Sequence, residues 1–218
     1  MYLPDKFKEE RLEVLQELIR SHPLGSLVTL EDGALNANHL PFLLTAPSAD
    51  APYGKLQGHI SRSNLLWQNH DGATEALVLF QGPHAYVTPT WYEEKERSGA
   101  VVPTYNYAVV HAHGPLRVMQ ESQELLALLQ RLTDRFESGR SAPWQVDDAP
   151  PAFIERLMDA IVGIEIPITR ISGKWKTSQN MTALDRITIA NGLRAQADGN
   201  SVAMAEIMEH QVFEEGQR

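Results

Sequence analysis

Residues 80–114 read FQGPHAYVTPTWY (80–92), EEKERSGAV (93–101) and VPTYNYAVVHAHG (102–114), and this stretch decides the fold. The first arm extends an apolar run through a Gly-Pro pair, which predicts a strand with a bend. The second arm alternates, with odd positions from Tyr105 to His113 on one face and even positions from Asn106 to Ala112 on the other. Neither face carries the charges typical of a solvated surface. We therefore expect a long strand pair in a barrel wall or a subunit interface.

Aromatic and amide side chains are concentrated at one end of this strand pair, where the first arm ends and the second begins, and these are Tyr86, Trp91, Tyr92, Tyr105, Asn106 and Tyr107. Planar groups beside neutral hydrogen-bonding groups suit a planar ligand with polar edges. The alternative is a hairpin whose aromatic residues belong to the core or to an interface. From this stretch alone, that simpler interpretation is favoured.

Composition limits the classes of function. The chain has 218 residues, of which 43% are hydrophobic, and this is enough for one sizeable core or for one core plus a helical appendage. Its formal charge of −9 argues against a general nucleic-acid or acidic-membrane surface. The chain has no cysteine, so thiolate metal sites and disulfides are excluded. No apolar run is long enough to span a bilayer, and we expect a cytoplasmic protein without membrane contact.

The remaining pattern predicts strands joined mainly by hairpins. Strands are expected at 26–30 and 34–44, joined at Glu31-Asp32-Gly33, then at 55–60, 76–118 as the central pair, and 161–171. Helices are expected at 5–20, within 61–69 with a stop at Asp71-Gly72, and at 123–137 and 153–158. Residues 173–180, GKWKTSQN, are expected to form an exposed basic turn after the last strand.

The C-terminal part is expected to be helical. Thr182 and Asp185 have capping-box spacing for a helix to about residue 195, and Asn200 or Ser201 caps another to about residue 210. The whole pattern predicts an α+β protein that is mainly β, an antiparallel barrel with helices at both ends and one inserted.

No strong catalytic motif is present, and four pieces of sequence remain as candidates for chemistry: 38–42, 58–64, 104–107 and 174–180. Ser61-Arg62-Ser63 at a strand-to-helix junction could bind a phosphate, because hydroxyls, a guanidinium and a helix start coincide. Simple N-capping by either serine is the alternative, and taken alone it is favoured. The segment from Lys174 to Asn180 combines cations, a ring and amides, although a solvated turn explains it equally well.

Four histidines raise the question of a metal: His39, His59, His111 and His113. The last two share a strand face at a spacing that can chelate. No carboxylate or thiol accompanies them at ligand spacing. We therefore predict hydrogen-bonded histidines and no metal site, and we assign no catalytic residue.

Eight ordered motifs resemble the PaiB-type family of FMN-binding proteins, often described as negative transcriptional regulators. They are MY-x-P-x-x-F from Met1, HLPF from His39, GHI from Gly58, GP-x-x-YV from Gly82, WY from Trp91, VPT-x-NY from Val102, HG from His113 and SQN from Ser178. The resemblance covers residues 1 to about 195. It implies a six-stranded split β-barrel, related to the pyridoxamine-phosphate oxidase fold, over residues 1–195, with residues 196–218 as a helical extension packed on the same domain.

The resemblance also implies a cofactor and its neighbours. A homodimer would hold FMN at the subunit interface, with His39, Pro41 and Phe42 lining the flavin ring. His59, Ser61, Arg62 and Asn64 would lie near the phosphate or ribityl chain. The site would be closed, from the partner subunit, by Thr104, Asn106, Lys174, Gln179 and Asn180.

Three functions remain open at this point. The first is a PaiB-type FMN protein acting as a redox-linked transcriptional regulator, for which the C-terminal helices offer a mixed surface rather than a basic recognition helix. The second is a small flavin-dependent oxidoreductase or flavin reductase. The third keeps the fold and binds haem through one of the histidines. The first of these functions would make DNA a partner of the protein, although the net charge of the chain does not support DNA binding.

Overall fold

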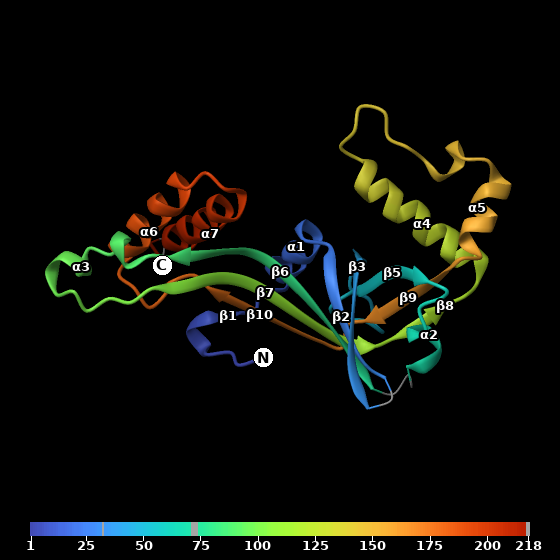
Figure 1. Ribbon diagram of the computed structural model, residues 1–218, viewed down its shortest axis with the longest axis horizontal. Helices are drawn as coiled ribbons and strands as arrows, with labels where there is room; N and C mark the ends of the chain where they lie inside the picture. The colour runs from blue at the N-terminus through green and yellow to red at the C-terminus, as the bar shows by residue number, and fades with distance from the viewer. Residues whose placement is uncertain (32, 71–73, 217–218) are drawn as a thin grey trace. The chain divides into compact units, whose positions relative to one another are not determined.

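The structure is a computed structural model that describes residues 1–31, 33–70 and 74–216 (Figure 1). The chain groups into two compact units. The first comprises Met1–Leu18, Gln81–Val110 and Ser172–Arg218, and the second comprises Ile19–Phe80 and His111–Ile171. The two strands of the central pair, β6 (Glu75–Val87) and β7 (Thr104–Pro115), each contribute residues to both units.

The second unit contains the hairpin of β2 (Leu24–Glu31) and β3 (Ala34–Pro41), as expected from the sequence. Glu31 pairs with Ala34, and Asp32 lies outside the described residues. The strand predicted at 34–44 is wrong in its length, because it divides into β3 and β4 (Leu43–Leu44). Between them Phe42 is buried in the core against Phe80, and its N–H bonds to Pro23 instead of continuing the ladder.

A four-stranded antiparallel sheet completes this unit. Its order is β4-β5-β9-β8, with β5 at Lys55–Ser61, β9 at Ile161–Pro167 and β8 at Arg117–Met119. Helices α4 (Ser122–Glu137) and α5 (Pro151–Met158), with the 3-10 turn η3 (Val146–Asp148), lie against it (Figure 1). The short helix α2 (Leu66–Asn69) follows β5, and its predicted stop at Asp71-Gly72 lies outside the described residues.

In the first unit, the predicted start of the N-terminal helix is wrong. The helix predicted at 5–20 starts only at α1 (Leu12–Ser21), after a 3-10 turn η1 (Asp5–Phe7) and a two-residue strand β1 (Lys8–Glu9). Glu9 pairs with Gly173 of β10 (Arg170–Lys176), and its carboxylate accepts the N–H of Arg11 at 2.9 Å. Residues 8–9 therefore pair with β10 instead of joining the helix, which begins only at Leu12.

The strand predicted at 161–171 is also corrected, because it is two strands, β9 and β10. The N–H groups of Ile168 and Thr169 bond to Gly54 and His113, so the chain leaves one sheet and enters the other at this point. Likewise β7 ends at Pro115, and the residues to Val118 belong to β8 in the four-stranded sheet.

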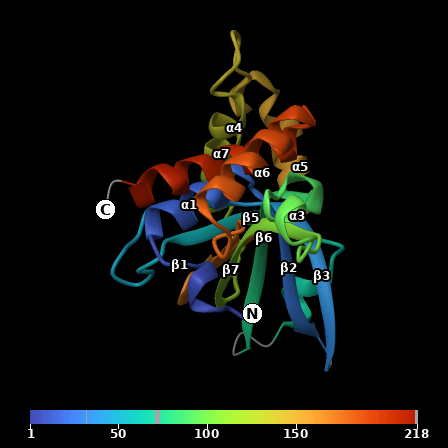
Figure 2. The same ribbon diagram turned by 90° about the vertical axis from the view of Figure 1, so that its left-hand side faces the viewer.

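Two C-terminal helices, α6 (Ala183–Ala195) and α7 (Gly199–Gly216), lie side by side in the first unit (Figure 2). Thr182 caps α6 as predicted, by accepting the N–H of Asp185. The predicted cap of α7 is wrong, because Asp198 accepts the N–H of Ser201 at 3.0 Å. The helices pack around a core cluster that includes Tyr92, Ile189, Leu193, Met204 and Met208. The 3-10 turn η2 (Pro89–Trp91) and helix α3 (Glu94–Arg97) lie before β7.

The six-stranded sheet has the order β1-β10-β7-β6-β2-β3, and its registered pairs are antiparallel. The α+β antiparallel architecture predicted from the sequence is confirmed. Along β7 the even positions from Asn106 to Gly114 are buried and the odd positions are partly exposed, as the alternation predicted. Within the described ranges, the helices are too short or too polar to cross a membrane.

Candidate functional site

The junction between β5 and α2 in the second unit contains several polar groups of the predicted site. The hydroxyls of Ser61 and Ser63 lie 2.8 Å apart, and the side-chain amide of Asn64 donates to Asn38 Oδ1 at 2.7 Å. Asn64 Oδ1 in turn accepts the N–H of Leu66 at the start of α2. Asn64 therefore connects the first residue of this short helix to β3, and neither serine caps α2.

Asn38 retains a buried amide nitrogen, Nδ2, that has no hydrogen-bond partner among the described residues. A buried donor without a partner costs on the order of 1–3 kcal/mol. A ligand or water that accepts from this amide would recover that cost. The residues present at this junction thus fit a ligand that carries acceptor oxygens. The ribityl chain and the phosphate of FMN both carry such oxygens.

Arg62 is held rigidly at the same junction. Its Nε donates to the carbonyl of Asp159 at 2.7 Å, and its Nη2 donates to the carbonyl of Ile161 at 2.9 Å. The guanidinium lies over the ring of Trp67, whose indole N–H donates to the Arg62 carbonyl. Nη1 has no bond to the part of the chain that the structure describes, so Arg62 presents a preorganised cationic donor.

The three residues predicted to line the flavin ring differ in exposure. His39 and Pro41 are exposed on β3, and Phe42 is buried with its ring edge-on to Phe80 at a centroid distance of 5.9 Å. Gly58 of β5 lies close by, because a Cβ there would be 3.1 Å from the Pro41 carbonyl oxygen. β3 and β5 thus bring His39, Pro41 and His59 into one region, whereas the Phe42 ring belongs to the core.

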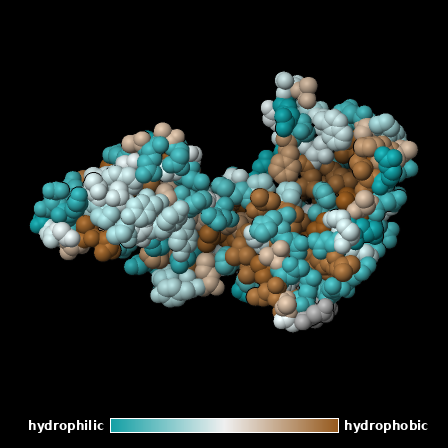
Figure 3. Space-filling model, viewed as in Figure 1, coloured by the Kyte–Doolittle hydropathy of each residue, from teal (hydrophilic) through white to brown (hydrophobic). Residues whose placement is uncertain are grey.

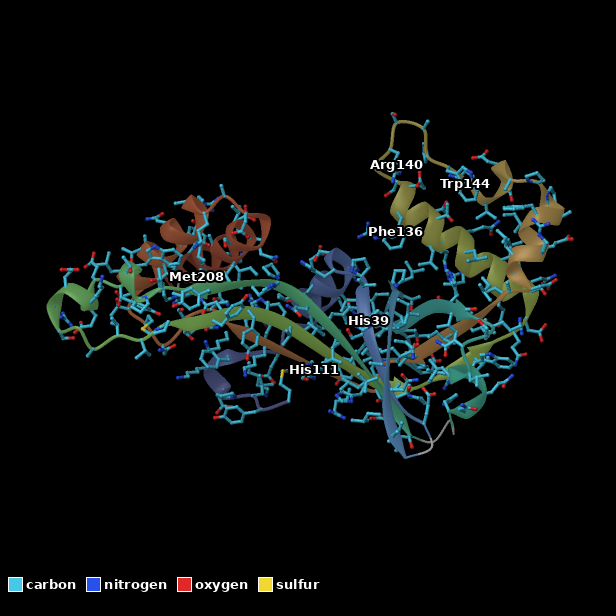
Figure 4. All side chains as sticks on the ribbon, in the orientation of Figure 1. His39, His111, Phe136, Arg140, Trp144 and Met208 are labelled. Carbon is cyan, nitrogen blue, oxygen red and sulfur yellow. The ribbon has the colours of Figure 1, made fainter. Side chains whose placement is uncertain are left out.

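His59 lines a pocket of about 300 Å³ between β5 and α4. Pro41 shares this wall, and the other lining residues are Leu129, Leu132, Thr133, Phe136, Glu137 and Trp144. Burial lowers the pKa of His59, so its imidazole is neutral at pH 7. Phe136 of α4 is 46% exposed and lies at the edge of this pocket (Figure 4).

The remaining predicted site residues lie in the first unit. The exposed basic turn predicted at 173–180 is wrong: Lys174, Trp175, Thr177 and Ser178 are buried, and residues 173–176 form the end of β10. Lys174 Nζ donates to the carbonyl of Tyr2 at 3.2 Å and lies over the rings of Tyr2 and Tyr107. Two aromatic faces and a carbonyl therefore enclose this side chain, which the sequence pattern did not indicate.

Lys176 and Thr104 are brought together. Lys176 Nζ donates to the hydroxyl of Thr104 and, at 2.6 Å, to the carbonyl of Tyr105. Burial, together with the charge of Lys174, lowers the pKa of Lys176. Proton loss from this amine is therefore easier than from an exposed lysine.

Asn106 and the Ser178-Gln179-Asn180 motif are also brought together. The Asn106 amide donates to Ser178 Oγ at 3.0 Å and contacts the sulfur of Met208. Gln179 bonds to backbone groups at both ends of its own turn, the carbonyl of Trp175 and the N–H of Thr177. Asn180 is exposed. Ser178 adopts φ 63°, a left-handed conformation that its two bonds to Asn106 stabilise.

The contact between Thr177, which lies in the candidate stretch 174–180, and Gln211 was not predicted from the sequence. The Thr177 hydroxyl donates to Gln211 Oε1 on α7, 34 residues further along the chain. No local pattern links two residues at this separation. Trp67, Phe136 and Trp144 were also missed as site residues, because no local pattern distinguishes them from the other aromatic residues.

Across the described ranges 1–31, 33–70 and 74–216, no cluster of three histidine or acidic side chains could hold a metal ion. The site residues therefore form two groups. One is at β3, β5 and α2 in the second unit, and the other is at β7 and the end of β10 in the first.

Solved structures show the class of fold. The flavocytochrome Anf3 from Azotobacter vinelandii superposes with a TM-score of 0.59 at 12% identity, over 78% of this chain and 69% of that chain. The FAD and heme binding protein from Mycobacterium smegmatis superposes with a TM-score of 0.56 at 19% identity, over 78% and 73%. The fold is that of the split-barrel flavin-binding proteins.

Sequence comparison gives the family. Residues 1–170 match the family described as "Putative FMN-binding domain". A protein of Emericella nidulans described as uncharacterized is 39% identical over 225 residues, covering 88% of this chain and 90% of its own. The Bacillus subtilis protein named Protease synthase and sporulation protein PAI 2 is 32% identical over 209 residues, covering 96% and 97%. The chain belongs to this PaiB-type family of FMN-binding proteins, as the eight motifs indicated.

Proposed function

We propose that FMN binds at the junction of β3, β5 and α2 in the second unit, with its phosphate near Arg62. The observation that carries this proposal is the fixed guanidinium, whose Nη1 remains available beside the two hydroxyls of Ser61 and Ser63. The buried, unpartnered amide of Asn38 next to Asn64 adds a second donor. His39, Pro41 and His59 supply the nearby surface for the ring, and Phe42 supports it from the core.

In this proposal the residues of the first unit, Thr104, Asn106, Lys174, Gln179 and Asn180, reach the cofactor from the partner subunit of a homodimer. Their hydrogen bonds keep the turn in one conformation before any ligand binds. Bound FMN supplies reversible hydride and electron transfer. The protein's own residues orient the ring, exclude water and neutralise the phosphate.

We infer that the activity is that of a small flavin-dependent oxidoreductase rather than a DNA-binding regulator. On α6 and α7 the basic residues face protein partners: Arg186 is buried, and Arg194 bonds to Glu209 at 2.7 Å. A recognition helix needs free basic side chains to contact phosphates and bases. The redox-linked regulator remains the alternative, and it predicts DNA binding despite the charge of −9. Fluorescence anisotropy with duplex DNA at low and physiological salt distinguishes the two; tight binding at physiological salt would favour the regulator.

Arg62→Ala tests the phosphate assignment. A charge-assisted hydrogen bond is worth roughly 1.5–3 kcal/mol, so the variant should bind FMN about ten- to a hundredfold more weakly. Riboflavin lacks the phosphate and should bind the variant and the parent equally. Flavin fluorescence quenching measures both affinities, and Arg156→Ala on α5, whose guanidinium lies over Phe153, is the matched control.

Equal losses for FMN and riboflavin in Arg62→Ala would contradict the phosphate assignment. The absorption spectrum of the purified protein separates the cofactors independently. Two bands in the blue and near ultraviolet indicate flavin, whereas a Soret band would support the haem alternative and a histidine ligand.

A further inference from the structure

The pocket between β5 and α4 has an unusual lining for an exposed place on a protein. Phe136 and Trp144 are 46% and 44% exposed, and both line it together with Leu129, Leu132 and Pro41 (Figure 4). Figure 3 shows hydrophobic residues gathered around the hollow beside α4. Two half-exposed aromatic rings at one pocket are costly in water, and a ligand that covers them gains free energy from their burial.

The segment after α4 is fixed so that Trp144 stays at this pocket. The carboxylate of Glu137 accepts the backbone N–H of Trp144 at 3.2 Å and pairs with Arg140 at 3.0 Å. The carboxylate of Glu137 is therefore bound by groups of the loop itself, the Trp144 N–H and the Arg140 guanidinium. The remaining pocket wall is almost entirely apolar. This charge pattern disfavours anionic ligands and favours neutral ones.

His59 supplies the polar group of the pocket. Its Nδ1 is buried without a hydrogen-bond partner within the described ranges. Because an unpaired buried N–H is rarer than an unpaired buried acceptor, we place the proton on Nε2. Burial also lowers the pKa of His59, so the ring is neutral. The imidazole then offers one N–H donor to a ligand in the pocket that it lines.

We propose that this pocket binds a small, neutral, planar aromatic molecule that carries a carbonyl or similar acceptor oxygen. The rings of Phe136 and Trp144 contact its faces or edges, and His59 donates a hydrogen bond to its oxygen. A volume of about 300 Å³ suits one or two fused rings and is at the lower end of ligand sites. The site shares Pro41 and His59 with the proposed flavin region, which makes such a molecule a candidate reaction partner of the flavin.

The probe is 1,4-naphthoquinone, and its binding to FMN-loaded protein is measured by equilibrium dialysis with naphthalene as the comparison. Naphthoquinone should bind with a Kd of about 10–100 μM. It should bind about fivefold more tightly than naphthalene, which has the same rings without an acceptor. The absence of cysteine removes covalent thiol addition as a confounding reaction.

Three variants locate the site. Trp144→Ala should weaken naphthoquinone about tenfold, and Trp144→Phe should bind close to the parent. Thr133→Phe places a ring inside the pocket and should abolish binding. Phe153→Ala removes an exposed aromatic residue of α5 outside this pocket and should leave Kd unchanged. Far-ultraviolet circular dichroism confirms that each variant is folded.

The results also separate this proposal from that of the flavin site. FMN affinity should be the same in the parent and in Thr133→Phe. Unchanged naphthoquinone binding in both Trp144→Ala and Thr133→Phe would overturn the proposal. Displacement of FMN by the probe would also overturn it, because the pocket would then hold the flavin ring itself. The dialysis repeated without FMN keeps the test valid if the flavin assignment fails.

Discussion

At the residue scale, Trp91 shows which of two interpretations of the aromatic residues holds. The sequence allowed a place beside a ligand but favoured the core or an interface, and the structure packs Trp91 against α6. Its carbonyl accepts the hydroxyl of Thr188 at 2.7 Å, and its indole lies directly over Gly192. Glycine at 192 is therefore a packing requirement of the Trp91 ring.

Gly192→Ala should lower the free energy of unfolding by about 1–3 kcal/mol. A Cβ at this position would lie 2.4 Å from Trp91 Cε2, which forces the ring or the helix to move. Urea unfolding followed by circular dichroism measures the loss. Gly199→Ala, where no atom lies within 4 Å of the added Cβ, is the control and should be neutral or slightly stabilising. Equal stabilities of the two variants would contradict the packing role.

His111 on β7 should make stability depend on pH. Burial, with smaller effects of the N-terminal charge and of His113, lowers the pKa of His111 to about 4, against an ordinary value near 6.5. Below pH 6.5 the unfolded chain takes up a proton that the folded protein does not bind. The free energy of unfolding should therefore fall as pH decreases from about 6.5 to about 4, and stay constant above this window as far as His111 is concerned.

Urea midpoints at pH 7 and pH 5 test this. His111→Gln should reduce the loss between the two pH values by roughly 2 kcal/mol, because pH 5 lies about 1.5 units below the unfolded pKa. His39→Gln, at an exposed position, is the control. An identical pH dependence in the parent and in His111→Gln would refute the assignment.

Some residue contacts were predictable and others were not, and the difference is distance along the chain. Thr182 and Asp185 are three residues apart, and their capping contact follows from local spacing. Lys174 was expected in solvent because its neighbours in sequence are polar. Its enclosure by Tyr2 and Tyr107 depends on segments more than 60 residues away. Local sequence propensities contain no information about contacts between segments so far apart.

At the scale of elements, periodicity succeeded where one face alone determines the structure. Helix α4 agrees with its predicted bounds to within a residue, and β7 shows the predicted alternation although it ends at Pro115 instead of continuing to Val118. Errors occur where a strand of another segment competes, as when β10 draws residues 8–9 out of the expected helix. They also occur where one extended run serves two sheets, as at Pro167.

The cap of α6 gives a prediction at this scale. Thr182→Ala removes the acceptor of the Asp185 N–H and should destabilise the protein by about 1 kcal/mol. Thr182→Ser keeps the hydroxyl and should recover most of this loss. Thermal unfolding by circular dichroism compares the three proteins. A serine variant as unstable as the alanine variant would show that the methyl group of Thr182 matters rather than the cap.

At the scale of the whole molecule, exposed aromatic residues lie on the two central strands of the six-stranded sheet, and we propose that they contact a second copy of the chain. Tyr86 on β6 and Tyr105 on β7 are 53% and 48% exposed, and His84 stacks on Tyr105 with ring centroids 6.0 Å apart. A symmetric partner could cover this face. The alternation in the sequence predicted that both faces of β7 would be covered by other groups. It did not predict which surface covers the face that carries Tyr105.

Light scattering at micromolar concentration should give twice the 24.4 kDa of one chain. Tyr105→Glu places a charge on the proposed contact and should shift the mass towards the monomer, whereas Phe213→Glu on exposed α7 should not. A clean monomer of the parent that still binds FMN would contradict both the dimer and the interface location of the cofactor.

The core cluster of α6 and α7 has a consequence for protein oxidation. Met204 and Met208 are fully buried, whereas Met1 is 48% exposed. Peroxide converts an accessible thioether to a sulfoxide, so the buried methionines can react only when the helix pair opens. The ratio of sulfoxide formed at Met208 to that at Met1 therefore measures how often this pair opens. Oxidation of its own methionines thus reports local unfolding of the helix pair, and mass spectrometry can follow it without an added label.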